Sequence, residues 1–81
     1  MMELIFYTTA GCHLCEQAET LLVQVPLPRP VPVSAVDISE STDLVERYGT
    51  RIPVLRRSDS GRELNWPFSA EDIQQFIAAD G

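Results

Sequence analysis

Two cysteines, Cys12 and Cys15, are the residues of this sequence best suited to chemistry. They are three positions apart in the run Cys12-His13-Leu14-Cys15, so one helical turn brings the two thiols together. Such a pair either exchanges electrons as a dithiol and disulfide or contributes ligands to a metal. A bridge between them closes a very short loop and would add little stability by chain entropy. The spacing therefore indicates a chemical use more than a structural one.

The pair is predicted to lie where a first strand passes into a first helix. Residues 4–8 are β-branched and aromatic, as in a buried parallel strand. A helix is predicted from about Cys12 to residue 23 or 25, with an apolar stripe formed by Leu14, Ala18, Leu21, Leu22 and Val25. The free N–H groups and the positive dipole at a helix start favour a thiolate, so we expect a lowered pKa for Cys12. Cys12 is thus the predicted nucleophile, and Cys15 the more buried resolving thiol.

Two questions about this pair concern the role of His13 and the binding of a metal. His13, if protonated, would favour the thiolate further, or it is simply an exposed spacer. A structural zinc site normally takes four ligands, whereas this chain offers two cysteines and one histidine between them. We therefore expect no metal here.

The rest of the chain predicts further strands and helices that would position the pair. Strands are expected at 31–38, from Ile52, and at 62–66, and helices at 43–48 and from Ser69. Gly49 is expected to end the short helix. In the last helix Ser69 would form a capping box with Asp72, and the buried face would be Ile73, Phe76 and Ile77. The order is β-α-β-α-β-β-α, with the first two strands parallel and the last two antiparallel.

Prolines occupy alternate positions after the first helix: Pro26, Pro28, Pro30 and Pro32. They end the helix and predict a stiff, extended crossover. The alternative is a proline-rich ligand for a partner domain, but the spacing contains no Pro-x-x-Pro.

Composition limits the class of protein. With 81 residues, 44% hydrophobic and 22% charged, residues 1–81 are expected to form one globular domain. The net charge is −6, and all six cations are arginines, without a basic stripe, so we expect no nucleic-acid partner. No apolar run reaches the roughly 20 residues of a membrane helix, and the N-terminus lacks a secretory pattern. We expect a cytoplasmic protein, in which cysteines are more often catalytic or metal-binding than structural.

The chain resembles the thioredoxin superfamily and, within it, the small glutaredoxin-like proteins of bacteria. The resemblance covers essentially the whole chain and rests on residues 6–15 (FYTTAGCHLC), 36–38 (VDI), 48–54 (YGTRIPV) and the turn near Gly61. It implies an α/β, thioredoxin-like fold of the glutaredoxin type, a four-stranded mixed sheet flanked by three helices. It also assigns catalysis to Cys12 and Cys15.

The resemblance implies a substrate site beside the cysteines. Pro53 would be cis and face the pair, and Ile52 would offer its backbone N–H and C=O to an extended substrate. His13 would lie beside the nucleophile. Arg51 would either meet an anionic substrate or be a solvated loop residue.

The chain also departs from the glutaredoxin pattern. His-Leu replaces Pro-Tyr between the cysteines, and Thr8 and Thr9 stand where a lysine is common. Trp66-Pro67-Phe68 replaces the Gly-Gly that admits glutathione, so Trp66 either contacts substrate or closes the core with Phe68. The start of the last helix, at Ser69 and Ala70, remains able to receive a carboxylate.

The expected function is that of a thiol–disulfide oxidoreductase with no bound cofactor. Its substrate would be a protein or low-molecular-weight disulfide, and glutathione or a reductase would reset it. One alternative is a metal or iron–sulfur carrier that uses Cys12. Another is an interaction domain that keeps the fold without turnover.

Overall fold

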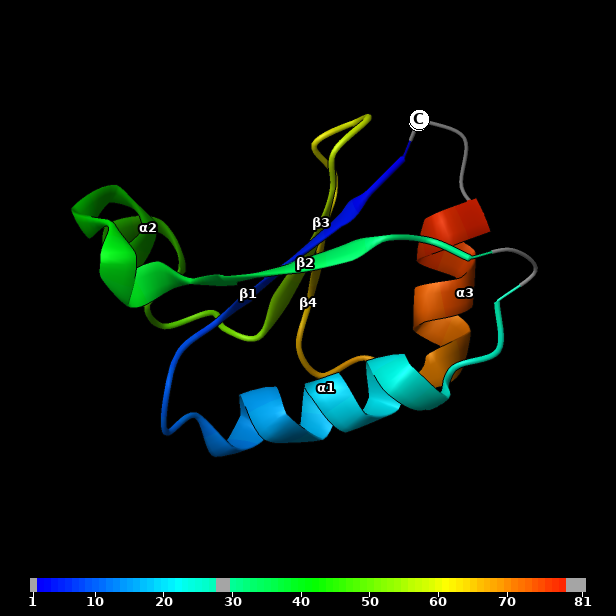
Figure 1. The fold of residues 1–81 in the computed structure, drawn as a ribbon, viewed down its shortest axis with the longest axis horizontal. Helices are drawn as coiled ribbons and strands as arrows, with labels where there is room; N and C mark the ends of the chain where they lie inside the picture. The colour runs from blue at the N-terminus through cyan, green and yellow to red at the C-terminus, as the bar shows by residue number, and fades with distance from the viewer. Residues whose placement is uncertain (1, 28–29, 79–81) are drawn as a thin grey trace.

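The computed structural model describes residues 2–27 and 30–78, and in this part of the chain a mixed sheet carries helices on both faces (Figure 1). The strands are β1 (Leu4–Thr8), β2 (Val33–Asp37), β3 (Val54–Arg57) and β4 (Glu63–Asn65). The helices are α1 (His13–Gln24), the short 3₁₀ helix η1 (Ile38–Glu40), α2 (Thr42–Tyr48) and α3 (Ala70–Ala78). This is the predicted order of elements.

The strand order in the sheet is β2-β1-β3-β4. β1 pairs in parallel with β2, and β3 pairs antiparallel with both β1 and β4. β4 therefore runs parallel to β1, so the carboxyl ends of β1 and β4 lie at the same edge. The predicted parallel crossover and final hairpin are both confirmed.

The two faces of the sheet have separate cores. Leu4 and Phe6 of β1 pack with residues of α1 and α3, whereas Tyr7 packs with Tyr48 of α2. Successive side chains of a strand point to opposite faces, so one short strand contributes to both cores. This agrees with the predicted burial of the first strand on both sides.

Helix α1 begins one residue later than predicted, and its buried stripe is different. Leu14 is 46% exposed, whereas Cys15 is only 2% exposed and Ala18 is fully buried. The prediction that Leu14 faces the core is therefore wrong. Cys12 precedes the first helical residue and caps the helix, so Cys15 is the residue of the first turn that faces the core.

Helix α2 begins at Thr42, and Ser41 caps it by accepting the Leu44 N–H at 3.4 Å. Gly49 ends it as predicted, but in a right-handed conformation with φ −53°. A Cβ at Gly49 would lie 2.5 Å from the Val45 carbonyl oxygen. Glycine is therefore required here because a side chain would collide with the Val45 carbonyl, and not because the backbone is left-handed.

Helix α3 has the predicted capping box. Ser69 Oγ accepts the Asp72 N–H at 3.1 Å, and Asp72 Oδ2 accepts the Ser69 N–H at 2.9 Å. Its buried residues are Ile73, Phe76 and Ile77, as predicted.

The segment between α1 and β2 has no regular secondary structure at Pro26, Pro30 and Pro32, which fits the predicted crossover. Pro28 lies outside the described residues. Gln74 of α3 donates its side-chain amide to the Pro26 carbonyl at 2.9 Å, so this crossover is attached to the last helix. The second strand is shorter than predicted, because η1 begins at Ile38.

Candidate functional site

Cys12 stands at the start of α1 as its N-cap residue. Its backbone is extended, with φ −84° and ψ 106°, and its Sγ accepts the Cys15 N–H at 3.1 Å. Gly11 precedes it with φ +76°, and no atom lies near the place of a Cβ. The positive φ alone favours glycine in the turn that places Cys12 at the start of α1.

Cys15 lies one turn further along α1 and belongs to the core cluster formed with Ala18, Phe68 and Ile73. Its Sγ is joined to that of Cys12 in a disulfide, with the two Cα atoms 5.2 Å apart. Cys12 is half-buried, while Cys15 is buried. This geometry gives one partly exposed cysteine and one buried cysteine.

His13 occupies the first position of α1. Its side chain is 84% exposed, and Nδ1 lies 3.7 Å from the Glu16 carboxylate. It is thus placed on the solvent side of the first helical turn, next in sequence to Cys12.

The Ile52–Pro53 peptide bond is cis, as the resemblance implies, and Pro53 is fully buried. Ile52 and Cys12 both pack against the core cluster that contains Cys15. The Ile52 N–H, however, already donates to the Tyr48 carbonyl at 3.1 Å. The N–H that was expected to meet substrate thus has an internal acceptor in this structure, because the chain turns tightly after α2.

Trp66 follows β4 and lies beside the proline loop. Its N–H donates to the Pro53 carbonyl at 3.3 Å, and its half-buried ring also packs against the core cluster of Cys15. Phe68 is buried and meets the Trp66 ring edge-on, with the ring centres 5.1 Å apart. The Trp66–Pro67 bond is also cis, which the sequence did not predict. Phe68 thus closes the core, and Trp66, like Cys12, is a partly buried residue packed against the cluster that contains Cys15.

The start of α3 differs from the expectation that it receives a substrate carboxylate. The Ser69 N–H is already bound by Asp72, a carboxylate of the same helix. The capping box therefore satisfies the Ser69 N–H internally, whereas the Ala70 N–H, which was also expected to bind an anion, takes no part in it.

The Arg51 side chain is 36% exposed and is bound to strand β4. Its Nη2 donates to Glu63 at 2.6 Å and to Asn65 at 3.0 Å, both residues of β4. Its guanidinium also lies over the Tyr48 ring, 5.1 Å from the ring centre. Neither interpretation of Arg51 included this pairing, in which β4 supplies the carboxylate that balances its charge.

Sequence reasoning missed the polar cluster around Glu63. The Tyr48 hydroxyl donates to Glu63 at 2.5 Å, and the Tyr48 ring stacks on Tyr7 with centres 4.1 Å apart. Burial, and then the hydrogen bond to Glu63, raise the pKa of Tyr48 to about 12. Burial alone would raise the pKa of Glu63, but hydrogen bonds from Tyr48 and Arg51 outweigh it and lower that pKa. The cluster fixes the loop that carries Ile52 and Pro53 against β4.

Metal binding gains no support from the side chains. Within residues 2–27 and 30–78, no group of three or more His, Cys, Asp or Glu side chains is arranged to hold a metal ion. In the same part of the chain, no helix combines the length and the apolar character needed to cross a membrane.

Comparisons with known proteins agree with this geometry. A comparison with curated proteins gave no match. The crystal structure of target protein XcR50 from X. campestris is similar, with 38% identity, a TM-score of 0.84, and coverage of 96% of this chain and 99% of that one. Protein Ne2328 from Nitrosomonas europaea is 26% identical, with a TM-score of 0.69 and coverage of 93% and 89%. Residues 3–78 match the family model described as Glutaredoxin-like domain (DUF836). The chain therefore belongs to this glutaredoxin-like family of the thioredoxin superfamily.

Proposed function

We propose that this protein is a thiol–disulfide oxidoreductase in which Cys12 is the nucleophile and Cys15 the resolving thiol. The observation that carries the proposal is the position of Cys12 as the cap of α1, with its sulfur bound to the Cys15 N–H and next to the Cys15 sulfur. A helix start and a hydrogen bond to sulfur both favour the thiolate, which is the reactive form.

The reaction begins from the reduced protein. The Cys12 thiolate attacks one sulfur of a substrate disulfide, a Cys12–substrate bond forms, and the other substrate sulfur leaves as a thiolate. The Cys15 thiolate then attacks the Cys12 sulfur, the second substrate thiolate leaves, and the Cys12–Cys15 disulfide remains. The substrate gains two electrons, and the protein loses two. Two molecules of a small thiol such as glutathione, or one dithiol reductase, return these electrons and complete the cycle.

The surroundings of Cys12 supply a surface for the substrate. Cys12, Ile52 and Trp66 all pack against the core cluster that contains Cys15. The Ile52 carbonyl is the backbone group left to accept a hydrogen bond from an extended substrate, since its N–H is already bound. Arg51 is held by Glu63, and the Ser69 N–H by Asp72, so two groups that would meet the carboxylates of glutathione are occupied. We therefore propose a protein or small disulfide as substrate in the cytoplasm, with glutathione acting only as a reductant from solution.

The test is intact-mass analysis of the protein equilibrated over a series of reduced and oxidised glutathione ratios. A reversible loss of two mass units with one defined midpoint is expected, and a midpoint between about −220 and −320 mV would place the couple near the cytosolic glutathione poise. Absence of a bridge at every ratio would overturn the proposal.

A pair of serine variants tests the order of the two thiols. Cys15→Ser, mixed with bis(2-hydroxyethyl) disulfide, is expected to accumulate a mixed disulfide on Cys12 that persists until free thiol is added. Cys12→Ser is the matched control and should accumulate almost none, because Cys15 is buried. Equal trapping by the two variants would contradict the assigned roles.

A further inference from the structure

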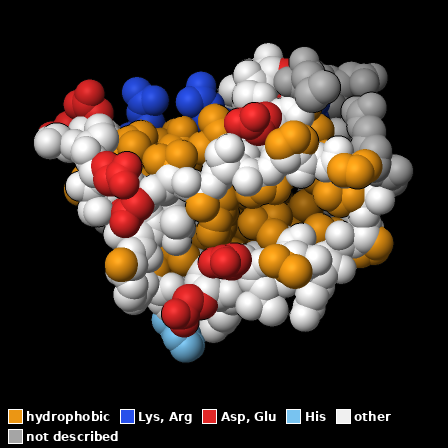
Figure 2. Space-filling view, viewed as in Figure 1, with side chains coloured by type: hydrophobic (Ala, Val, Ile, Leu, Met, Phe, Trp, Pro, Cys, Tyr) orange, Lys and Arg blue, Asp and Glu red, His pale blue; other side chains and the backbone are white. Residues whose placement is uncertain are grey.

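An apolar groove lies between α1 and the edge strand β2, away from the cysteines. Its volume is about 360 Å³, and it is lined by Phe6, Glu19, Leu22, Val23, Val33 and Ala35. Figure 2 shows it as a hollow with a hydrophobic floor in the middle of this face. Val23 is 81% exposed and Val33 is 46% exposed, so α1 leaves apolar side chains of both elements uncovered.

The groove continues into an open sheet edge. β2 is the first strand of the order β2-β1-β3-β4, so no strand of the described chain pairs with its outer side. The Pro32 carbonyl accepts the Leu4 N–H of β1 at 2.9 Å. Backbone groups alternate in direction along a strand, and those of Val33 and Ala35 therefore point to the open edge. The same two residues line the groove with their side chains.

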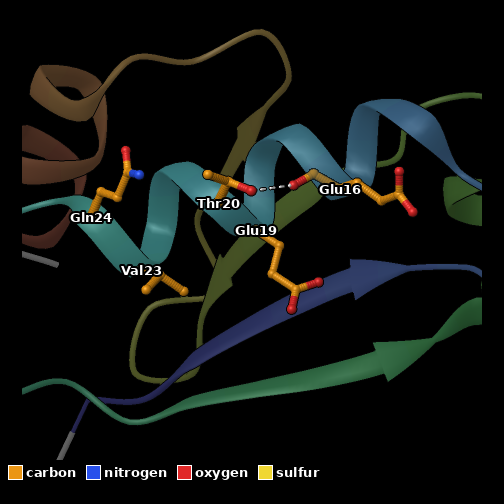
Figure 3. Close-up of a pocket in the computed structure, with 5 residues that line it drawn as sticks. All are labelled: Glu16, Glu19, Thr20, Val23 and Gln24. Carbon is orange, nitrogen blue, oxygen red and sulfur yellow. Dashed lines mark hydrogen bonds between the residues drawn. The ribbon is translucent and has the colours of Figure 1, made fainter.

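Carboxylates surround this region. Glu19 lines the groove itself, and Glu16 lies one turn earlier on α1 (Figure 3). In Figure 3 the side chains of Glu19 and Val23 extend from α1 toward β1 and β2. On the other side of the strand, Glu3 accepts a hydrogen bond from Ser34 of β2 at 3.2 Å. Glu19 is the charged residue among those that line the groove, and it is acidic.

We propose that the groove and the β2 edge together bind an extended segment of a partner protein in which apolar residues alternate with lysine or arginine. Such a segment would pair with the backbone of Val33 and Ala35 as an added strand. Its side chains would then alternate between the two faces of the sheet. Those on the α1 face would contact Val23 and Val33, and those on the opposite face would reach Glu3. The alternation of apolar and basic residues in the partner segment thus follows from the different side chains on the two faces of β2.

A second copy of this chain fits the surface poorly. Two copies would bring two sets of the same carboxylates together, and each chain has a net charge of −6. Like charges placed opposite each other oppose association. The groove therefore favours a basic partner over self-pairing, independently of whether the cysteines turn over a disulfide.

The test uses oxidised, ¹⁵N-labelled protein and the probe peptide acetyl-Lys-Val-Lys-Val-Lys-Val-Lys-amide, followed by amide chemical shifts. Shifts are expected in residues 33–37 and 19–23 and not in α2. Two control peptides replace every lysine by glutamate or every valine by serine, and both should bind at least about tenfold more weakly.

Matched variants locate the binding. Val23→Lys should weaken binding about tenfold, because it removes an apolar contact and adds a like charge. Val45→Lys, the same change at a valine of α2 that is 45% exposed, should leave binding unchanged. Glu3→Gln should weaken binding about threefold, and Glu46→Gln on α2 should not.

Three outcomes would overturn the proposal. One is no shift at residues 33–37, and another is equal binding of the lysine and glutamate peptides. The third is a concentration-dependent shift of the same residues in protein alone, which would make a second copy the occupant. Dispersed spectra of every variant confirm that the fold is kept in each comparison.

Discussion

Helices α1 and α3 begin with the same cap geometry but with different atoms. At α1 the Sγ of Cys12 accepts the Cys15 N–H at 3.1 Å, and at α3 the Oγ of Ser69 accepts the Asp72 N–H at 3.1 Å. In both cases the acceptor lies three residues before the donor. A sulfur can therefore take the place of the usual hydroxyl at a helix start and still satisfy the backbone.

The two starts differ in how their positive end is balanced. The first turn of α3 holds two acidic residues, Glu71 and Asp72, and Asp72 also binds the Ser69 N–H. The first turn of α1 holds only Glu16, which lies near His13. Negative charge within the first turn offsets the helix dipole. The positive end of α3 is thus balanced by its own carboxylates and has a structural role. The positive end of α1 is less balanced and stabilises negative charge on the Cys12 sulfur.

The largest expected effect comes from giving α1 the cap atom of α3. Cys12→Ser keeps an acceptor for the Cys15 N–H, so the free energy of unfolding of the reduced protein should change by less than about 0.5 kcal/mol. Reduction of bis(2-hydroxyethyl) disulfide should fall by at least about a thousandfold, because the nucleophile is lost. Steady-state rates and urea unfolding measure the two quantities. Retention of full activity would show that Cys12 is not the nucleophile.

The reverse transfer gives α3 the cap atom of α1. Ser69→Cys, made in a Cys12→Ser, Cys15→Ser background, introduces a thiol at a start with two nearby carboxylates. At pH 7 it should react with iodoacetamide roughly three- to tenfold more slowly than Cys12 does in the Cys15→Ser protein, because the carboxylates disfavour the thiolate. Equal rates would mean that the acidic first turn of α3 does not matter.

Loss of the structural cap should affect stability alone. Ser69→Ala removes the acceptor for the Asp72 N–H and should cost about 1 kcal/mol of unfolding free energy. Disulfide reduction at 25 °C should remain within about twofold of the unmodified protein, since Ser69 takes no part in the chemistry. A large loss of activity without loss of stability would contradict the assignment of this start as structural.

The smallest expected effect is that of replacing Glu63. This carboxylate lies outside both helix starts, and its contribution to stability depends on pH. Its pKa is lowered below the ordinary 4.5, so the stability it contributes is fully present above that pH and is lost as the pH falls through the folded-state value. Glu63→Gln should cost about 0.5 to 1 kcal/mol at pH 7 and progressively less below pH 4.5. Urea unfolding at three pH values measures the trend, and a cost that grows toward low pH would reverse the sign of this argument.

The sequence predicted those features that depend on neighbouring residues. The cap at Ser69 and the turn before Cys12 are local patterns, and the parallel pairing of the first two strands was expected from the helix that joins them. Leu14 was assigned to the buried face of α1, but it is exposed. The spacing of apolar residues does not show which residue caps the helix, so it does not fix which residue of the first turn faces the core. Once Cys12 is the cap, Cys15 faces inward.

The contacts of Arg51 could not be predicted in the same way. Its partners Glu63 and Asn65 belong to β4, and they meet it only through the register between β3 and β4. Likewise, the Ile52 N–H is bound by Tyr48 because the chain turns immediately after α2. Such pairings depend on the three-dimensional path of the loop and leave no pattern in the sequence.

Arg57 has a consequence for how the C-terminal third of the chain unfolds. It is only 5% exposed, and it donates to the Phe76 carbonyl of α3 at 2.8 Å and to Asp59 at 2.7 Å. If α3 separated from the sheet, this charged donor would exchange the Phe76 carbonyl for water, and the net loss would be about 1.5 to 3 kcal/mol. The β3–β4 hairpin and α3 therefore form one cooperative unit, and their amide protons should exchange with solvent through a common opening.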